Sequence, residues 1–150
     1  MLKRIKVQTE DFDLEAEYRQ LNDGHASGAV VTFSGLVRDE EGQLLGLELE
    51  HYPGMTEKAL SNIVDVAKAR WPLHAVTVIH RVGYLKVNEQ IVFVGVASAH
   101  RLAAFEAANF IMDYLKTRAP FWKKEHSVHG EPSWVAAKAS DQQAAERWQE

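Results

Sequence analysis

Alternation of polar and apolar residues predicts half-buried β-strands along the first third of the chain. The clearest cases are residues 3–8 and 45–52, where the alternation is typical of a strand with one face on a core and the other in water. Residues 28–38 are rich in β-branched side chains and predict a further strand. Residues 39–43 are acidic and contain Gly42, so we expect a loop that joins the strands at 28–38 and 45–52 as a hairpin.

Three further strands are predicted in the second half of the chain, at residues 75–81, 91–98 and 121–126. The run at 91–98 is almost continuously apolar, which is typical of a strand that is buried on both faces. Gly83 is expected to form a turn between the first two of these strands.

Two short helices are predicted towards the ends of the chain. The first begins after Asp13, whose side chain suits an N-cap, and ends at the turn-forming residues 22–24. The second covers residues 140–148, with Ser140 as its N-cap.

Two long helices are predicted from apolar residues at helical spacing. One begins at Thr56 and ends at Trp71-Pro72, because proline does not continue a helix. The other follows His100 and ends at residues 118–120. We expect its apolar stripe and the aromatic residues that follow to lie in the core: Phe105, Ala108, Met112, Tyr114, Leu115, Phe121 and Trp122.

The order of these elements indicates an α+β fold in which helices pack on a mostly antiparallel sheet. The 150 residues contain no repeat, low-complexity tract or linker, so we expect a single domain over residues 1–150. A chain of this length buries about 70% of its unfolded surface, which is enough for a core without disulfides.

Composition excludes several classes of function. The chain has 17 basic and 21 acidic residues, and this net charge of −4 argues against nucleic-acid binding by bulk electrostatics. It has no cysteine, which excludes thiolate nucleophiles, iron–sulfur clusters and cysteine-containing zinc sites. Any sulfur that this protein handles must therefore arrive on another molecule. The seven histidines are scattered, so we expect no metal site and no cofactor. No secretory signal or membrane-spanning run is recognisable, which predicts a cytoplasmic location.

The start of the second long helix is a candidate anion site. His100 and Arg101 are basic residues at the positive end of a helix dipole, where they do not favour stability. Free amides at a helix start together with a guanidinium suit a phosphate or a carboxylate. The alternative is that Arg101 extends into solvent or pairs with a nearby acid.

The end of the same helix offers a second candidate. Lys116 lies near the helix C-terminus, and Pro120 forces the chain to turn, so a following strand can bring Lys123 back beside it. Two ammonium groups in one partly dry pocket would bind an anionic substrate and lower each other's pKa, which favours proton transfer or nucleophilic chemistry. The alternative is a charged turn exposed to water.

Arg38 is a third and weaker candidate. It stands at a predicted strand end after Gly35, which permits close backbone approach, and this combination suits a phosphate contact. An edge arginine that only keeps the strand soluble is the alternative.

Several stretches resemble one known family, the large, catalytic subunits of molybdopterin synthase (the MoaE family). They are GAVVTFSGLVR (28–38), LEHYPGMTEKAL (49–60), RWPLHAVTVIHRVG (70–83), IVFVGVASAHR (91–101), FIMDYLKTRAPFWKKE (110–125) and SDQQAAERW (140–148). The resemblance covers nearly the whole chain, and HYPGM and YLKTRAPFWK are its most specific parts.

The resemblance implies an activity, partners and a fold. The family converts cyclic pyranopterin monophosphate (precursor Z) into molybdopterin by installing two dithiolene sulfurs. Each sulfur arrives as a thiocarboxylate on the C-terminal Gly-Gly of a small ubiquitin-like subunit. The large subunit forms a homodimer, and two small subunits complete a heterotetramer. The implied fold is an α/β hammerhead with an additional antiparallel β subdomain.

The resemblance also implies roles for particular residues. Lys116 and Lys123 match the two lysines of the family's active site. The residues that match its substrate pocket are Phe33, Leu36, Val37, Arg38, His100, Arg101, Met112, Lys124 and Glu125. Lys138 matches a position from which a neighbouring protomer reaches the pocket, where the family often has arginine; lysine keeps the charge but loses the bidentate fork.

Two other readings of the sequence remain open. One is a binding module that senses a phosphorylated metabolite, which needs an anion pocket but no pair of converging lysines. The other is a scaffold for a small protein partner. The discriminating feature is whether Lys116 and Lys123 share a pocket with Arg38 and Arg101.

Overall fold

The structure, a computed structural model, describes residues 1–22, 24, 26–39, 41–135 and 139–149. Its elements in chain order are β1 (Leu2–Gln8), α1 (Leu14–Leu21), β2 (Ala29–Leu36), β3 (Leu44–His51), α2 (Met55–Arg70), β4 (Leu73–Arg81), β5 (Gly83–Lys86), β6 (Gln90–Ser98), α3 (Arg101–Arg118), β7 (Phe121–Ser127), β8 (Ser133–Val135) and α4 (Ala139–Glu146).

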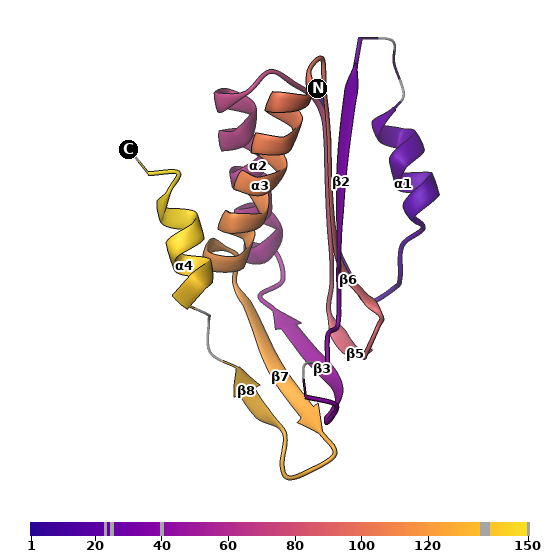
Figure 1. The fold of residues 1–150 in the computed structure, drawn as a ribbon, viewed down its shortest axis with the longest axis vertical. Helices are drawn as coiled ribbons and strands as arrows, with labels where there is room; N and C mark the ends of the chain where they lie inside the picture. Colours follow the sequence, from indigo (N-terminus) through magenta and orange to yellow (C-terminus); the bar gives the residue numbers. More distant parts are fainter. Residues whose placement is uncertain (23, 25, 40, 136–138, 150) are drawn as a thin grey trace.

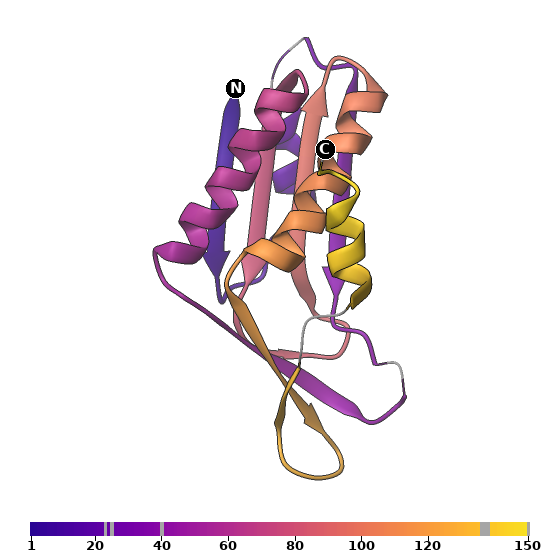
Figure 2. The ribbon, with the colours of Figure 1, turned by 90° about the vertical axis from the view of Figure 1, so that its left-hand side faces the viewer.

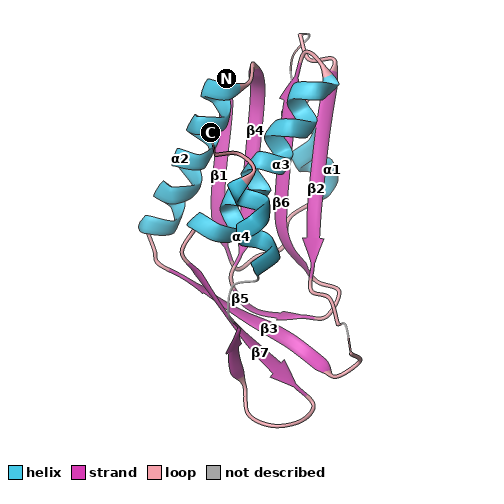
Figure 3. Ribbon diagram, turned by 60° about the vertical axis from the view of Figure 1, so that its left-hand side comes forward, coloured by secondary structure: helices cyan, strands magenta, loops and turns pink. Residues whose placement is uncertain are grey.

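The strands form two four-stranded sheets, which confirms the predicted α+β class. The first sheet has the order β1-β4-β6-β2, and only the β1–β4 pair within it is parallel. The second sheet has the order β5-β3-β7-β8 and is antiparallel throughout. Figure 3 shows the second sheet extending away from one end of the first.

Helices cover both faces of the first sheet. α2 and α3 lie on one face and α1 lies on the other (Figure 1). Successive side chains of β4 point to opposite faces of the sheet. Val76 and Val78 pack with α2 and α3, whereas Ala75 and Ile79 pack with α1. β6 is likewise buried on both faces, as its continuous apolar run predicts.

α1 is stabilised by its N-cap. An ion pair with β1 and the close packing of Leu21 on Gly95 of β6 hold it to the first sheet. The Asp13 side chain accepts hydrogen bonds from the amides of Glu15 and Ala16, so the predicted N-cap is confirmed. The buried carboxylate of Glu17 accepts two hydrogen bonds from the Arg4 guanidinium on β1. These bonds satisfy a charge that would otherwise be costly to bury.

The predicted hairpin between the strands at 28–38 and 45–52 is wrong. β2 pairs with β6 in the first sheet, whereas β3 pairs with β5 and β7 in the second. Alternation along a strand specifies that one face is buried and does not specify the neighbouring strand. The short strands β5 and β8 were not predicted, and Gly83, expected only as a turn, begins β5 with a φ of 91°.

Two aromatic residues expected in the core are exposed. Phe105 is 56% exposed, because the buried stripe of α3 runs one position earlier, through alanines that let the helix lie close to the sheet. Trp122 is 47% exposed on β7, and its neighbour Phe121 is half-buried. The terminal helix begins at Ala139, one residue before Ser140, so Ser140 lies inside α4 and is not its N-cap.

Gly95 in β6 gives a test of how α1 is packed. A Cβ at this position would overlap the Leu21 side chain and lie 2.9 Å from the ring of Phe93, and both of these neighbours are buried. We expect Gly95→Ala to lower the free energy of unfolding by about 1–3 kcal/mol through overpacking, measured by urea denaturation.

The matched control is Thr77→Val, on the strand position that pairs with Gly95. The Thr77 hydroxyl is fully buried and has no hydrogen-bond partner among the described residues. Its removal should leave the free energy of unfolding unchanged or slightly higher. Equal losses in both variants would contradict the packing argument.

Candidate functional site

Lys116 and Lys123 flank a sharp reversal of the chain. Lys116 lies in the last turn of α3 and Lys123 on β7, and both side chains are exposed. Between them, Ala119 is extended, because a residue before proline is disfavoured in the helical region, and Pro120 leads directly into β7. Figure 2 shows α3 passing into β7 at the end of the helix that faces the second sheet.

Both lysines lie near one buried histidine. His80, near the end of β4, is 4% exposed, and burial lowers its pKa to about 4. A hydrogen bond to the Arg81 carbonyl opposes this shift, and the charges of Lys123, His51 and Lys116 add to it. Since the effect of a charge weakens with distance, Lys116 and Lys123 both lie in the neighbourhood of this imidazole. We call Lys116, Lys123, His51 and His80 the lysine site.

The position and protonation of the His80 ring are well defined. It stacks on Phe121 with a centroid distance of 3.9 Å and an interplanar angle of 20°. Its Nδ1 lies 2.8 Å from the Arg81 carbonyl oxygen. A carbonyl only accepts, so Nδ1 carries the proton and Nε2 is the acceptor nitrogen of a neutral ring.

The two most specific stretches of the sequence meet at this site. His51 of the HYPGM stretch pairs in register with Phe121, and Leu49 pairs with Lys123. Thr56, which follows this stretch, is fully buried; its Oγ1 accepts from the Tyr52 amide at 3.0 Å and donates to the Pro120 carbonyl at 2.9 Å. The start of α2 is therefore bonded directly to the turn between the lysines.

Arg38 belongs to the same end of the molecule. Val37, immediately before it, is buried in a small cluster with Leu49 and Leu85. The amide of Val37 donates to the Glu89 carbonyl, and its own carbonyl accepts from the Asn88 amide. These bonds fix the chain just before Arg38 beside β3, the strand that pairs with Lys123.

The other residues that match the family's substrate pocket differ in their burial and in the element that carries them. Met112 is half-buried one helical turn before Lys116. The Lys124 ammonium lies 4.6 Å from the ring centre of Trp134, and Glu125 is exposed. Phe33 and Leu36 are exposed on β2, which is an edge strand of the first sheet.

His100 and Arg101 do not reach the lysine site within one chain. They are exposed at the start of α3, where no side chain caps the first amides and no acidic residue lies in the first turn. A rise of about 1.5 Å per residue separates the Cα atoms of Arg101 and Lys116 by about 22 Å, far more than the length of either side chain. The expected single pocket is therefore divided between two ends of α3. Lys138 lies outside the described residues.

Sequence reasoning missed His51, Thr56 and His80. The only signal for His80 was a histidine inside a predicted strand, at a position that alternates with Val76 and Val78 and faces α2 and α3. His51 and Thr56 stood in or next to the most specific stretch, but their contacts join segments that are far apart in the sequence.

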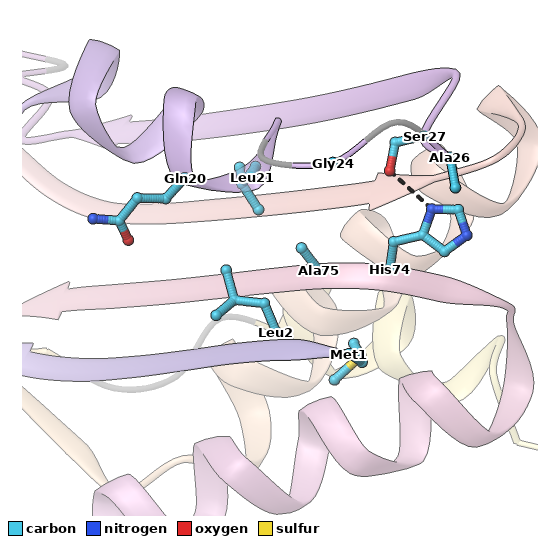
Figure 4. A pocket seen from close by; sticks show the side chains of 9 residues that line it. All are labelled: Met1, Leu2, Gln20, Leu21, Gly24, Ala26, Ser27, His74 and Ala75. Atoms are coloured by element: carbon cyan, nitrogen blue, oxygen red, sulfur yellow. Dashed lines mark hydrogen bonds between the residues drawn. The ribbon is translucent and has the colours of Figure 1, made fainter.

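Two hollows among the described residues lie away from the lysine site. One, of about 300 Å³, lies beside the starts of β1 and β4, where the Ser27 hydroxyl and His74 Nδ1 are 2.8 Å apart (Figure 4). The other, of about 330 Å³, lies between α2 and α3 and is lined by Ile63, Phe110 and Tyr114, among others. The lysine site lies at the junction of the two sheets, where α3 passes into β7.

The described residues contain no group of three or more histidine, aspartate or glutamate side chains placed to hold a metal ion. None of their helices is long and apolar enough to cross a membrane.

Comparison with known proteins gives consistent results. The family model described as MoaE protein matches residues 7–118. The molybdopterin synthase catalytic subunit of Mesorhizobium japonicum is 60% identical over 146 residues, which cover 96% of this chain and 92% of that protein.

Solved structures agree in fold. The molybdopterin biosynthesis MoaE protein of Burkholderia ambifaria is 48% identical, with a TM-score of 0.84 and 98% of each chain covered. A complex of subunits 1 and 2 of the molybdopterin-converting factor of Helicobacter pylori contains the same fold, with a TM-score of 0.74, 19% identity and 92% of each chain covered.

The neutral state of His80 predicts a loss of stability in acid. The ordinary pKa of 6.5 is lowered to about 4 on folding, so between these values the unfolded chain binds a proton that the folded chain does not. The free energy of unfolding therefore falls as the pH decreases from 6.5 towards 4, by about 3 kcal/mol in all, and this contribution is constant below 4.

The measurement is urea denaturation at about pH 7 and about pH 4.5, for the natural chain and for His80→Phe. Other groups titrate in both proteins, so the difference between the two pH dependences isolates His80. The same pH dependence in both would show that His80 is not kept neutral by the fold.

Proposed function

The chain belongs to the MoaE family of molybdopterin synthase catalytic subunits, and we propose that the lysine site is where it transfers sulfur. The chain is an enzyme of molybdenum cofactor biosynthesis. The observation that carries the proposal is the turn at Pro120, which Lys116 and Lys123 flank next to one buried, uncharged imidazole. Such a group of cations favours an anionic substrate and developing negative charge.

The substrate that we propose is cyclic pyranopterin monophosphate. Its phosphate suits lysine and arginine side chains, and Arg38 stands at the same end of the molecule as the lysines. The resemblance to the family implies that the sulfur comes from a thiocarboxylate at the C-terminus of a small ubiquitin-like subunit, and this agrees with a chain that has no cysteine of its own. Lys116 contacts that thiocarboxylate and the reacting pterin carbon, and activates the acyl carbon or relays a proton, while Lys123 stabilises developing negative charge.

The small subunit is the partner that the comparisons support, since a structure of related fold was solved as a complex of two subunits. We further propose a cytoplasmic heterotetramer built on a homodimer of this chain. The reason for the homodimer is the distance between the two ends of α3: a second copy can bring its His100 and Arg101 to the lysine site of the first. The uncapped amides at the start of α3 would then join the phosphate pocket.

Replacing the lysines tests the assignment of the site. We expect Lys116→Ala to abolish detectable product and Lys123→Ala to lower kcat by about 100-fold or more, because each removes charge stabilisation of the transition state. The assay combines the protein, thiocarboxylated small subunit and precursor Z, and follows the dithiolene product by mass spectrometry.

Lys68→Ala, on the exposed last turn of α2, is the matched control and should keep full turnover. Binding of the small subunit should be intact in all three variants. Full activity in Lys116→Ala would refute the site, and a natural chain that binds pterin and partner without turnover would favour the binding-module reading.

Complementation tests the homodimer. Arg101→Ala and Lys116→Ala should each be nearly inactive alone. When the two variants are co-expressed, random pairing puts one copy of each in about half of the dimers. In such a mixed dimer one site has both Lys116 and Arg101, and the other site lacks both. About a quarter of the natural turnover should therefore return. No recovery in mixed dimers would show that Arg101 acts within its own chain or not at all.

A further inference from the structure

We propose that His80 and Thr56 are positioning residues of the lysine site, which hold the turn at Ala119 and Pro120 from two sides and so set the separation of Lys116 and Lys123. The proposal rests on the proposed function, because this separation matters for turnover only if the two lysines act on one substrate. Neither residue needs to touch the substrate.

The start of β7 decides where Lys123 lies. Lys116 is fixed by its helix, since Ile111 and Leu115 on the inner side of α3 are buried. Lys123 lies on β7, whose backbone pairs with β3 at Leu49 and with β8 at Val135, so Lys123 is held by the second sheet and not by α3. A small rotation at Pro120 would therefore move Lys123 relative to Lys116.

His80 holds the turn from the first sheet. Its strand lies between β1 and β6, where His80 pairs with Val7 and Val92, so its backbone is fixed on both sides. The bond from Nδ1 to the Arg81 carbonyl fixes the ring plane. The stacked ring of Phe121, two residues before Lys123, then takes its position from the centre of the sheet.

Thr56 holds the turn from α2. Its hydroxyl donates to the Pro120 carbonyl and accepts from the Tyr52 amide, so one buried oxygen joins the end of β3, the start of α2 and the turn. Thr56 is completely buried, and loss of this hydroxyl would leave two backbone groups without these partners.

The neutrality of His80 fits this role. Charged or titratable groups face it from three elements, namely Lys116 on α3, Lys123 on β7 and His51 on β3. A positive charge on His80 would repel the lysines that the ring positions. An uncharged aromatic ring is therefore what the site requires at this position, and a phenyl ring meets the same requirement.

Two matched pairs of variants test the proposal, with Thr77→Val as a control on the same strand. His80→Leu removes the stacked ring, and His80→Phe keeps one. Thr56→Val removes the hydroxyl with little change of shape, and Thr56→Ser keeps it. We expect His80→Leu and Thr56→Val to lower kcat by about 10- to 100-fold with KM changed by less than about threefold, and the conservative partner of each to recover most of kcat.

A second readout does not depend on activity. A short bifunctional succinimidyl ester should cross-link Lys116 to Lys123 in the natural chain, as detected by mass spectrometry of tryptic peptides. The yield should fall in His80→Leu and Thr56→Val and return in His80→Phe and Thr56→Ser. This result stands even if the chain shows no turnover, so failure of the proposed function and failure of the positioning proposal are distinguishable.

Three results would overturn the proposal. The first is full kcat and full cross-linking in His80→Leu and Thr56→Val. The second is a loss of folded protein in these variants with unchanged kcat per folded molecule, which would make the role purely structural. The third concerns His80→Phe: it would be as inactive as His80→Leu, or turnover would no longer fall at low pH in this variant although it does so in the natural chain. Either result would show that the imidazole takes part in the reaction.

Discussion

The reversal of the chain at Pro120 is the constraint on which the arrangement of charged groups depends. Proline ends α3 and keeps the preceding Ala119 extended, so β7 begins within two residues of the last helical turn. The second sheet is built on β7 and β3, and its register places His51 beside Phe121. The position of this one turn therefore determines both how the second sheet meets the first and where the two lysines lie.

The lysine site concentrates positive charge on a protein whose net charge is −4. Lys116 and Lys123 keep their ammonium groups exposed, which avoids the cost of burying them, while the imidazole beside them is buried and uncharged. The site therefore presents exposed positive charge that can attract an anion. This arrangement suits a phosphorylated substrate and a thiocarboxylate better than it suits a general-base mechanism that depends on a histidine near neutral pH.

α3 connects this site to a second cationic end at His100 and Arg101. The helix is too long for both ends to serve one pocket in a single chain, and its rigid backbone keeps them apart. The same helix that supplies much of the core thus divides the residues that resemble one family pocket. The proposed homodimer would resolve this division, because its symmetry would bring the start of one α3 to the end of the other.

The sequence by itself determined the family and most of the elements, although not the short strands β5 and β8. Asp13, Trp71-Pro72 and the apolar run of β6 act locally, through capping, a missing amide donor and periodicity, so their consequences were predictable. Lys116 and Lys123 were also selected from the sequence, as a candidate pair on either side of Pro120. Only the tertiary structure decided that β2 pairs with β6, that Phe105 faces solvent and that His80 and Thr56 hold the lysine turn. These features depend on contacts between segments far apart in the chain, and local periodicity does not specify which segments will meet.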